Sequence, residues 1–247
     1  MSPSIEHLKV LLIQARSSQD IEHQEQACFL ERCRIDPPQL IPFNITRSPL
    51  TNALLAGMDA VMIGGAGEYS ATQNYPWMPA LLDFVRLLYE RSIPTFGSCW
   101  GHQIIARALG GEVIYDTARA ELGCHPVQLT EAAHDDPLFQ SFPDRFLVNM
   151  GHHDRVSVPP PGAIELAVSE SQGFQAFRMA GKPMYGTQFH SELDAHRERD
   201  RLIRYRSYYV RELPDETAFQ AVMNNLADTT DVDHLLNDFL VKCVAQS

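Results

Sequence analysis

Long hydrophobic runs are missing from the sequence, which bears on its relation to membranes. A helix needs about 20 consecutive apolar residues to cross a bilayer, and no apolar run among the 247 residues approaches that length. The N-terminal stretch MSPSIEHLKVLLIQ also lacks the basic segment and small-residue cleavage site of a secretory signal peptide. We therefore expect a cytoplasmic protein without a membrane partner, whose first strand lies in this stretch.

Basic residues are scarce relative to acidic ones. The chain has 20 Lys and Arg against 31 Asp and Glu, a formal net charge of -11. Nucleic-acid binding depends on clustered Lys and Arg that contact phosphates, so this balance argues against a nucleic-acid partner. The hydrophobic content of 45% is typical of a globular protein with a substantial core.

Cysteine spacings typical of a disulfide framework or a zinc site are missing as well. The five cysteines are Cys28, Cys33, Cys99, Cys124 and Cys243. An odd number without regular spacing is a poor disulfide framework, which agrees with a reducing compartment. A zinc site would need a shorter spacing than that of the first two and a second pair elsewhere. We expect packing roles for those two, no metal, and no cofactor, since no nucleotide-binding fingerprint such as GxxxxGK[ST] occurs.

Strand and helix patterns alternate through the first half of the chain. Short apolar runs typical of buried strands occur at 8–14, 40–45, 60–63, 93–97 and 112–116. Amphipathic or helical patterns separate several of them, at 19–35, 77–92 and 100–111. This alternation predicts right-handed βαβ units and a parallel sheet.

The second half changes to successive strands and then to helices. Strand patterns occur at 124–130, 145–154, 163–171, 173–179 and 184–191, and the chain from 194 onward is predicted to be helical. We expect an α/β fold with a mostly parallel central sheet flanked by helices, a β-rich second half and a helical C-terminal tail. No linker or repeat interrupts the chain, so we expect one domain over 1–247, with 193–247 as a helical extension.

An arginine-rich helix is predicted at 195–212, AHRERDRLIRYRSYYVRE. One interpretation is a solvated helix on which Asp200 and Arg204 form an i,i+4 ion pair. The other is a docking surface for an acidic ligand or partner. The pattern favours the solvated helix, because charge-rich helix faces are usually solvent-exposed.

The pentapeptide Gly97-Ser98-Cys99-Trp100-Gly101 matches G-x-nucleophile-x-G, the strand-to-helix turn that presents a nucleophile. Side chains at the two glycine positions would crowd the neighbouring backbone. The following helix directs its N-terminus at the thiol, which favours a thiolate. Alternatively, Cys99 is a small buried residue at a tight turn, and the pentapeptide alone leaves both interpretations open.

A thiolate nucleophile needs a base and an orienting group, and the segment GTQFHSE offers both. His190 and Glu192 are two residues apart, so on an extended segment their side chains leave by the same face. For the oxyanion, the segment MIGGAGEYS places a glycine pair after a strand. We expect the backbone N–H groups of Gly65 and Trp100 to form the oxyanion hole. Taken singly, His190 could equally be an ordinary surface or core histidine, and the glycine pair could equally belong to an ordinary turn.

The segments GGAGEYS, GSCWGHQ and GTQFHSE resemble, in order and approximate spacing, those of class I glutamine amidotransferases. The similarity is greatest to the amidotransferase part of GMP synthetase and its free-standing relatives, and covers about 10–193. It implies a triad of Cys99, His190 and Glu192 that cleaves the γ-amide of glutamine through a γ-glutamyl thioester and releases ammonia. The family's His-Pro-Glu is His-Ser-Glu here, and the proline takes no part in the chemistry.

The same resemblance implies substrate contacts. Gln103 corresponds to a family residue one helical turn after the nucleophile that helps to bind glutamine. The segment GHHDRV resembles the family's His-x-Asp segment, which makes His153 and Asp154 candidate contacts for the amino-acid end of the substrate. Ordinary solvated residues at a strand end would give the same pattern.

Three functions stay open from the sequence. Because no synthetase motif is present, the first is a glutaminase that passes ammonia to a separate synthetase subunit. The second is a free-standing hydrolase of γ-glutamyl peptides or conjugates, and the third is a catalytically silent binding or regulatory subunit. A cysteine peptidase-like relative that uses His102 as its base would explain fewer of the motifs.

Overall fold

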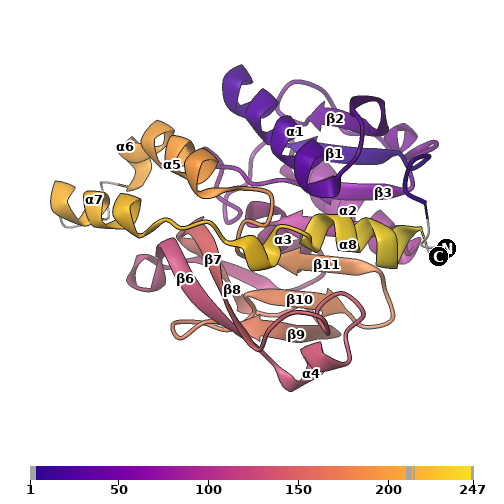
Figure 1. Cartoon of the computed structure of the whole chain (residues 1–247). Helices are drawn as coiled ribbons and strands as arrows, with labels where there is room; N and C mark the ends of the chain where they lie inside the picture. The colour runs from indigo at the N-terminus through magenta and orange to yellow at the C-terminus, as the bar shows by residue number, and fades with distance from the viewer. Residues whose placement is uncertain (1–3, 210–212, 214, 246–247) are drawn as a thin grey trace.

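The structure is a computed structural model that describes residues 4–209, 213 and 215–245. These residues form a nine-stranded sheet, in the order β2-β1-β3-β4-β11-β10-β9-β6-β7, and a two-stranded sheet of β5 and β8 (Figure 1). The strands are β1 (Val10–Gln14), β2 (Leu40–Asn44), β3 (Ala60–Ile63), β4 (Thr95–Ser98), β5 (Glu112–Tyr115), β6 (Glu121–Leu129), β7 (Arg145–His152), β8 (Asp154–Val158), β9 (Ala163–Val168), β10 (Ala176–Met179) and β11 (Met184–Thr187).

Helices lie on both faces of the large sheet, and α5 to α8 follow β11, its last strand in the sequence. They are α1 (Gln19–Cys33), α2 (Met78–Glu90), α3 (Trp100–Ala108), α4 (Glu131–His134), α5 (Ala195–Arg204), α6 (Arg206–Tyr209), α7 (Glu216–Asn225) and α8 (Leu235–Phe239). A π-helical turn, Leu240–Val244, continues α8. Short 3₁₀ turns occur at Pro37–Gln39, Asn52–Leu55, Thr117–Arg119 and Thr230–Val232.

The large sheet is parallel from β2 to β11 and antiparallel from β11 to β7. The expected α/β fold, with its β-rich second half and C-terminal helices, is confirmed. In the register of β4 and β11, Ser98 lies opposite Thr187. Parallel strands bring their carboxyl ends to one edge of the sheet. Cys99 comes directly after β4 and His190 shortly after β11, so both lie at the same edge of the sheet.

Alternate residues of the central strands enter two different cores, as the pleat requires. On β1, Val10 and Leu12 belong to the core beneath α1 and α8, whereas Leu11 and Ile13 belong to the core beneath α2 and α3. Both faces of the central strands are apolar for this reason, and the sheet edge is left to carry the polar side chains.

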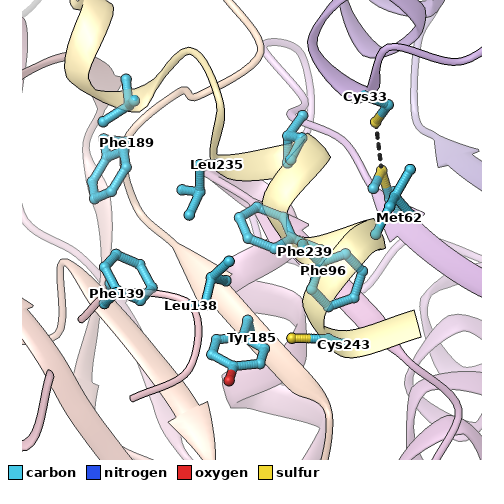
Figure 2. Packing of buried hydrophobic residues seen from close by; sticks show 14 of the residues in the cluster. Cys33, Met62, Phe96, Leu138, Phe139, Tyr185, Phe189, Leu235, Phe239 and Cys243 are labelled. Atoms are coloured by element: carbon cyan, nitrogen blue, oxygen red, sulfur yellow. Dashed lines mark hydrogen bonds between the residues drawn. The ribbon is translucent and has the colours of Figure 1, made fainter. Parts of the chain in front are cut away.

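The C-terminal helix α8 is part of the first core. Its Phe239 ring lies 5.5 Å from the ring of Phe96 on β4 and 6.1 Å from that of Tyr185 on β11 (Figure 2). Figure 2 also shows Cys33 next to Met62, with 3.5 Å between the sulfur atoms. Cys28 is buried too, so both early cysteines pack as expected.

Candidate active site

Cys99 sits in a strained turn between β4 and α3. Its φ of 50° and ψ of -98° are unusual for a residue with a side chain, and such strain is typical of functional sites. A Cβ atom on Gly97 would lie 2.5 Å from the carbonyl carbon of Gly101, and one on Gly101 would lie 2.2 Å from the carbonyl oxygen of Ile63. Glycine is therefore required at both positions for α3 to approach the sheet this closely.

His190 and Glu192 form a buried hydrogen-bonded pair beside this turn. The distance from His190 Nδ1 to Glu192 Oε1 is 2.7 Å, and Ser98 Oγ donates to Glu192 Oε2, also at 2.7 Å. With Nδ1 directed at the carboxylate, Nε2 is left for Cys99. The structure therefore brings together the three residues that were predicted from the sequence to form the triad. Ser98 is a second partner of the carboxylate that the sequence patterns did not indicate.

Charges in this group reinforce one another. Burial lowers the pKa of His190, but the charges of Glu192 and Cys99 outweigh it and raise that pKa well above 6.5. Burial acts to raise the pKa of Glu192, and the charge and hydrogen bond of His190, together with Arg201 and Ser98, hold it at about 2. The arrangement favours an imidazolium between a carboxylate and the Cys99 sulfur.

The other four thiols are in environments that suppress ionisation. Burial raises the pKa of Cys28 to about 12 and that of Cys243 to about 11, and it also raises the pKa values of Cys33 and Cys124. Thiolates are the reactive form of cysteine, so these four are inert at neutral pH.

The two expected oxyanion donors differ in their present partners. Trp100 is the first residue of α3, where backbone N–H groups have no acceptor within the helix. Gly65 lies beside the histidine, since a Cβ atom on it would be 3.2 Å from His190 Cε1. Its N–H, however, donates to Glu25 Oε1 at 3.2 Å. The role of Gly65 thus stays a prediction, and it requires this N–H to turn from Glu25 towards the substrate.

A buried ionic network joins Glu25, which accepts from the N–H of Gly65, to Glu192. Arg16 Nη2 lies 2.6 Å from Glu25 Oε1. Arg201, on α5, lies between two carboxylates, with 3.9 Å from Nη2 to Glu25 Oε1 and 3.7 Å from Nη1 to Glu192 Oε1. The side chains of these residues are at most 6% exposed. Such burial is stable for charges only when they are paired in this way.

The arginine-rich helix, predicted at 195–212, differs from the solvated helix expected from the sequence: α5 ends at Arg204, and 210–212 lie outside the described residues. The expected partner of Asp200 was Arg204, but the structure places Asp200 Oδ2 3.8 Å from His196 Nε2 and directs Arg204 Nη2 at Ser18 Oγ, 3.2 Å away. The inward face instead carries residues spaced by three or four, which is the usual signal of a buried helix stripe. These buried residues are Glu198, Arg201, Leu202 and Tyr205.

A cavity of about 520 Å³ opens beside Cys99, and the remaining candidate residues line it. Gln103 Nε2 donates to the carbonyl oxygen of Asp154 at 2.6 Å and to Gln188 Oε1 at 3.1 Å. Gln188 Nε2 in turn donates to Cys99 Sγ at 3.6 Å. Gln103 thereby holds the cavity wall in place and connects it to the nucleophile.

Asp154 has one carboxylate oxygen committed and one available. Oδ2 accepts from Ser70 Oγ and from the N–H of Ala71, both at 2.7 Å. Oδ1 is buried and has no hydrogen-bond partner among the residues that the structure describes. An acceptor in that situation is suited to the ammonium group of an amino acid.

Two further histidines are held neutral. Burial lowers the pKa of His153, which lines the cavity, to about 4, with His152 contributing. Burial lowers the pKa of His102 to about 3, and its ring packs against Phe177 with 4.6 Å between centroids. His102 therefore occupies a core position, which counts against its use as the base of a peptidase-like site.

Comparison with known proteins identifies the family. The model of the class I glutamine amidotransferase family matches residues 37–209. The chain belongs to this family. The resemblance found in the sequence is thereby confirmed.

Among curated proteins, the chain is similar to glutamine-hydrolysing GMP synthases. It is 32% identical over 139 residues to a glutamine-hydrolysing GMP synthase subunit from Archaeoglobus fulgidus, covering 56% of this chain and 69% of that one. It is 30% identical over 166 residues to the corresponding subunit from Methanothermobacter thermautotrophicus, covering 67% of this chain and 81% of that one. With the GMP synthase of Thermosipho africanus it shares 30% over 155 residues, which is 63% of this chain but only 28% of that longer protein.

Solved structures show the same fold at lower identity. A glutamine amidotransferase from Thermotoga maritima superimposes with a TM-score of 0.75 at 22% identity, covering 97% of this chain and 99% of that one. A glutamine amidotransferase from Methylobacillus flagellatus superimposes with a TM-score of 0.70 at 23% identity, covering 96% of this chain and 92% of that one.

Two kinds of feature are not found in the described part of the chain. None of its helices is long and apolar enough to cross a membrane. Its His, Cys, Asp and Glu side chains form no group of three or more that could hold a metal ion.

Proposed function

We propose that this protein is a cysteine-dependent glutamine amidohydrolase, with Cys99, His190 and Glu192 as its catalytic triad. The observation that carries the proposal is the convergence of a strained cysteine turn and a buried His–Glu pair on one edge of the sheet. Family membership and glutamine-hydrolysing relatives support it. The raised pKa of His190 supports its role as the proton donor.

The chemistry follows the two halves of acyl transfer. The Cys99 thiolate attacks the γ-carbonyl carbon of glutamine, and backbone N–H groups at Trp100 and Gly65 stabilise the oxyanion. His190 gives its proton to the amide nitrogen, the C–N bond breaks, and ammonia leaves a γ-glutamyl thioester. His190 then takes a proton from water, whose oxygen attacks the thioester, and glutamate and the free thiolate result. Glu192 holds the imidazole orientation throughout.

The large cavity receives the amino-acid end of the substrate. Asp154 Oδ1, the buried acceptor, binds the α-ammonium group, and His153 lines the same cavity as a neutral contact. Gln103 fixes the backbone of Asp154 and the side chain of Gln188. One chain of hydrogen bonds, from Asp154 through Gln103 and Gln188, thereby connects the substrate-binding cavity to the nucleophile.

The ammonia is proposed to pass to a separate synthetase subunit in the cytoplasm. Two of the similar proteins are themselves single subunits of a GMP synthase, which implies at least one other chain in each of those enzymes and motivates this step. We also propose that 1–247 folds as a single domain, which the packing of α8 against β4 and β11 supports.

Replacing the nucleophile tests the proposal. Cys99→Ala is expected to abolish the release of ammonia and glutamate from glutamine, and to abolish covalent trapping by a glutamine-derived α-halo ketone. Cys124→Ala, which removes another buried thiol, is the matched control and should keep both. Equal labelling of the wild type and Cys99→Ala would show that another residue reacts and would overturn the assignment.

One observation favours a second candidate, the hydrolysis of γ-glutamyl peptides or conjugates. The cavity of about 520 Å³ is in the size range of pockets that bind drug-sized ligands, which are larger than glutamine. Turnover of glutamine and of γ-glutamyl dipeptides under the same conditions separates the two. A clear preference for glutamine removes this candidate.

A further inference from the structure

A second, much smaller cavity adjoins the large one at Cys99 and is lined by His190. Its volume is about 30 Å³, and its lining includes Cys99, His190, Glu198 and Arg201. About 10–15 Å³ suffices for one water molecule, so this cavity admits one molecule, or at most two, of the size of water or ammonia. We refer to it as the Glu198 cavity.

The catalytic histidine belongs to the small cavity and not to the large one. Within the described residues, His190 lines the Glu198 cavity, whereas Cys99 lines both cavities. In amide hydrolysis the group that leaves is the one that the general acid protonates, so it departs next to the histidine. The acyl part of the substrate would thus lie in the large cavity and its leaving group would point into the small one, and the two cavities adjoin at Cys99.

Glu198 is a buried acceptor that lacks a partner. It is 2% exposed, and its Oε2 forms no hydrogen bond within the residues that the structure describes. Leaving a buried polar atom unsatisfied costs free energy, so such an atom is suited to bind a small polar molecule. Glu198 and His190 line the same cavity, and the charge of Glu198 contributes to the raised pKa of His190.

Arg201 supplies the complementary donor. Its Nη2 forms an ion pair with Glu25 at 3.9 Å but makes no hydrogen bond in the described parts of the chain. The Glu198 cavity therefore presents a carboxyl acceptor and a guanidinium donor, both almost fully buried. Ammonia and water each donate and accept hydrogen bonds, so each of them matches this pair of groups.

We propose that the Glu198 cavity binds the leaving ammonia and then the hydrolytic water, with Glu198 accepting a hydrogen bond from each. The inference rests on the proposed glutaminase function and deepens it by assigning the leaving-group site. When the C–N bond breaks, the nitrogen carries the proton from His190 into the cavity as neutral ammonia. A water molecule replaces it, gives one proton to His190 and attacks the thioester carbon.

This assignment restricts the substrate class to unsubstituted γ-amides. A methyl group on the amide nitrogen would have to enter the same small cavity, where Glu198 and Arg201 occupy the wall. Exclusion of one methyl or methylene group is worth about 10- to 200-fold in kcat/KM. Wild-type protein is therefore expected to prefer glutamine over γ-N-methylglutamine by a factor in that range.

Two variants of Glu198 give separate readouts. Glu198→Ala enlarges the cavity, so the preference for glutamine over γ-N-methylglutamine should narrow at least about tenfold. Glu198→Gln keeps the volume, so it should keep the preference and lower kcat for glutamine about tenfold, with KM little changed, because the group acts on the leaving nitrogen and the water. Asp200→Ala, on the exposed face of the same helix, is the control and should change neither quantity.

The outcomes separate this inference from the function on which it rests. If wild type hydrolyses both amides equally, or if the preference and kcat are the same in both Glu198 variants as in wild type, the leaving-group site is overturned while the glutaminase function stands. If wild type neither hydrolyses glutamine nor is labelled at Cys99, the proposed function fails, and the inference fails with it. Should Glu198→Ala not fold, the kcat of Glu198→Gln and the wild-type preference still decide.

Discussion

Arg201 Nη1 lies 3.7 Å from Glu192 Oε1, inside the protein and beside the carboxylate of the proposed triad. The relationship connects helix α5 to the triad, and through Glu25 it extends to Arg16 and the N–H of Gly65. Arg201 is therefore not part of a solvated helix face, and we infer that it positions Glu192.

Replacing Arg201 should weaken both folding and catalysis. Arg201→Met removes a positive charge that lies between the buried carboxylates of Glu25 and Glu192. Removing one partner of a buried ion pair typically costs about 3–5 kcal/mol. We expect a loss of this order in the free energy of unfolding, measured with urea, together with a lower kcat. Arg204→Met, on the exposed side of the same helix, is the control, and its stability should stay within about 0.5 kcal/mol of wild type. Equal effects of the two variants would contradict the positioning role.

The pH dependence of activity should report the charge of Glu192. The pKa of His190 is raised well above 6.5, so the imidazolium needed to protonate the leaving group persists at neutral pH and is lost as the pH rises through that raised value. Glu192→Gln removes the largest of the charges that raise the pKa of His190. The alkaline limb of the kcat/KM profile should therefore move to lower pH, and kcat should fall as well. An unchanged limb would assign that ionisation to another group.

The same pair should affect stability in a defined window of pH. The contribution of His190, whose pKa is raised in the folded state, is fully present below 6.5 and is lost as the pH rises through the raised value. The contribution of Glu192, whose pKa is lowered to about 2, is present above 4.5 and is lost as the pH falls towards 2. The destabilisation by Glu192→Gln, measured by urea unfolding across this range, should thus be greatest between 4.5 and 6.5.

Local patterns made the grouping of Cys99, His190 and Glu192, the proposed triad, predictable from the sequence. The glycines around Cys99 and the two-residue spacing of His190 and Glu192 are readable without knowledge of tertiary contacts. The parallel strands and the order of motifs were sufficient to place them on one edge, because parallel strands end together. Strand 112–116 was likewise predicted, but its pairing with β8 outside the main sheet depends on tertiary packing.

The residues around the triad could not be predicted, for a physical reason. Arg16 and Glu25 come from the N-terminal region, whereas Glu198 and Arg201 come from α5, and only the packed fold brings them together. Charged residues on a helix are normally exposed, so their burial cannot be inferred from composition. The spacing of Glu198, Arg201, Leu202 and Tyr205 was the one signal that indicated an inward face.

Iodoacetamide should distinguish a competent enzyme from a silent subunit. Native protein at neutral pH should be modified at one thiol, Cys99, because burial raises the pKa values of the other four and suppresses their thiolates. Mass spectrometry of the native and the urea-unfolded protein gives the count, and unfolding should expose all five cysteines. Native protein in which Cys99 stays unmodified would favour the binding or regulatory role.

Asp154 should act on substrate binding more than on chemistry. In Asp154→Asn the buried acceptor for the α-ammonium group loses its charge, and hydrogen bonds to charged groups are worth about 1.5–3 kcal/mol. KM for glutamine should therefore rise about 10-fold to 100-fold, with a much smaller change in kcat. Asp83→Asn, which alters a side chain that is 75% exposed on α2, is the control. A fall in kcat at unchanged KM would instead assign Asp154 to the chemical step.

The C-terminal helix should be needed for the stability of the whole protein. Phe239 is fully buried against Phe96 and Tyr185, on the two strands that precede Cys99 and His190 (Figure 2). Phe239→Ala is therefore expected to lower the free energy of unfolding by about 3–5 kcal/mol, in one cooperative urea transition. Ile203→Ala, at a side chain that is 55% exposed, should stay within about 0.5 kcal/mol of wild type. If Phe239→Ala instead produced a separate early transition and left the activity intact, the segment after 193 would be an independent extension and not part of the domain that holds the site.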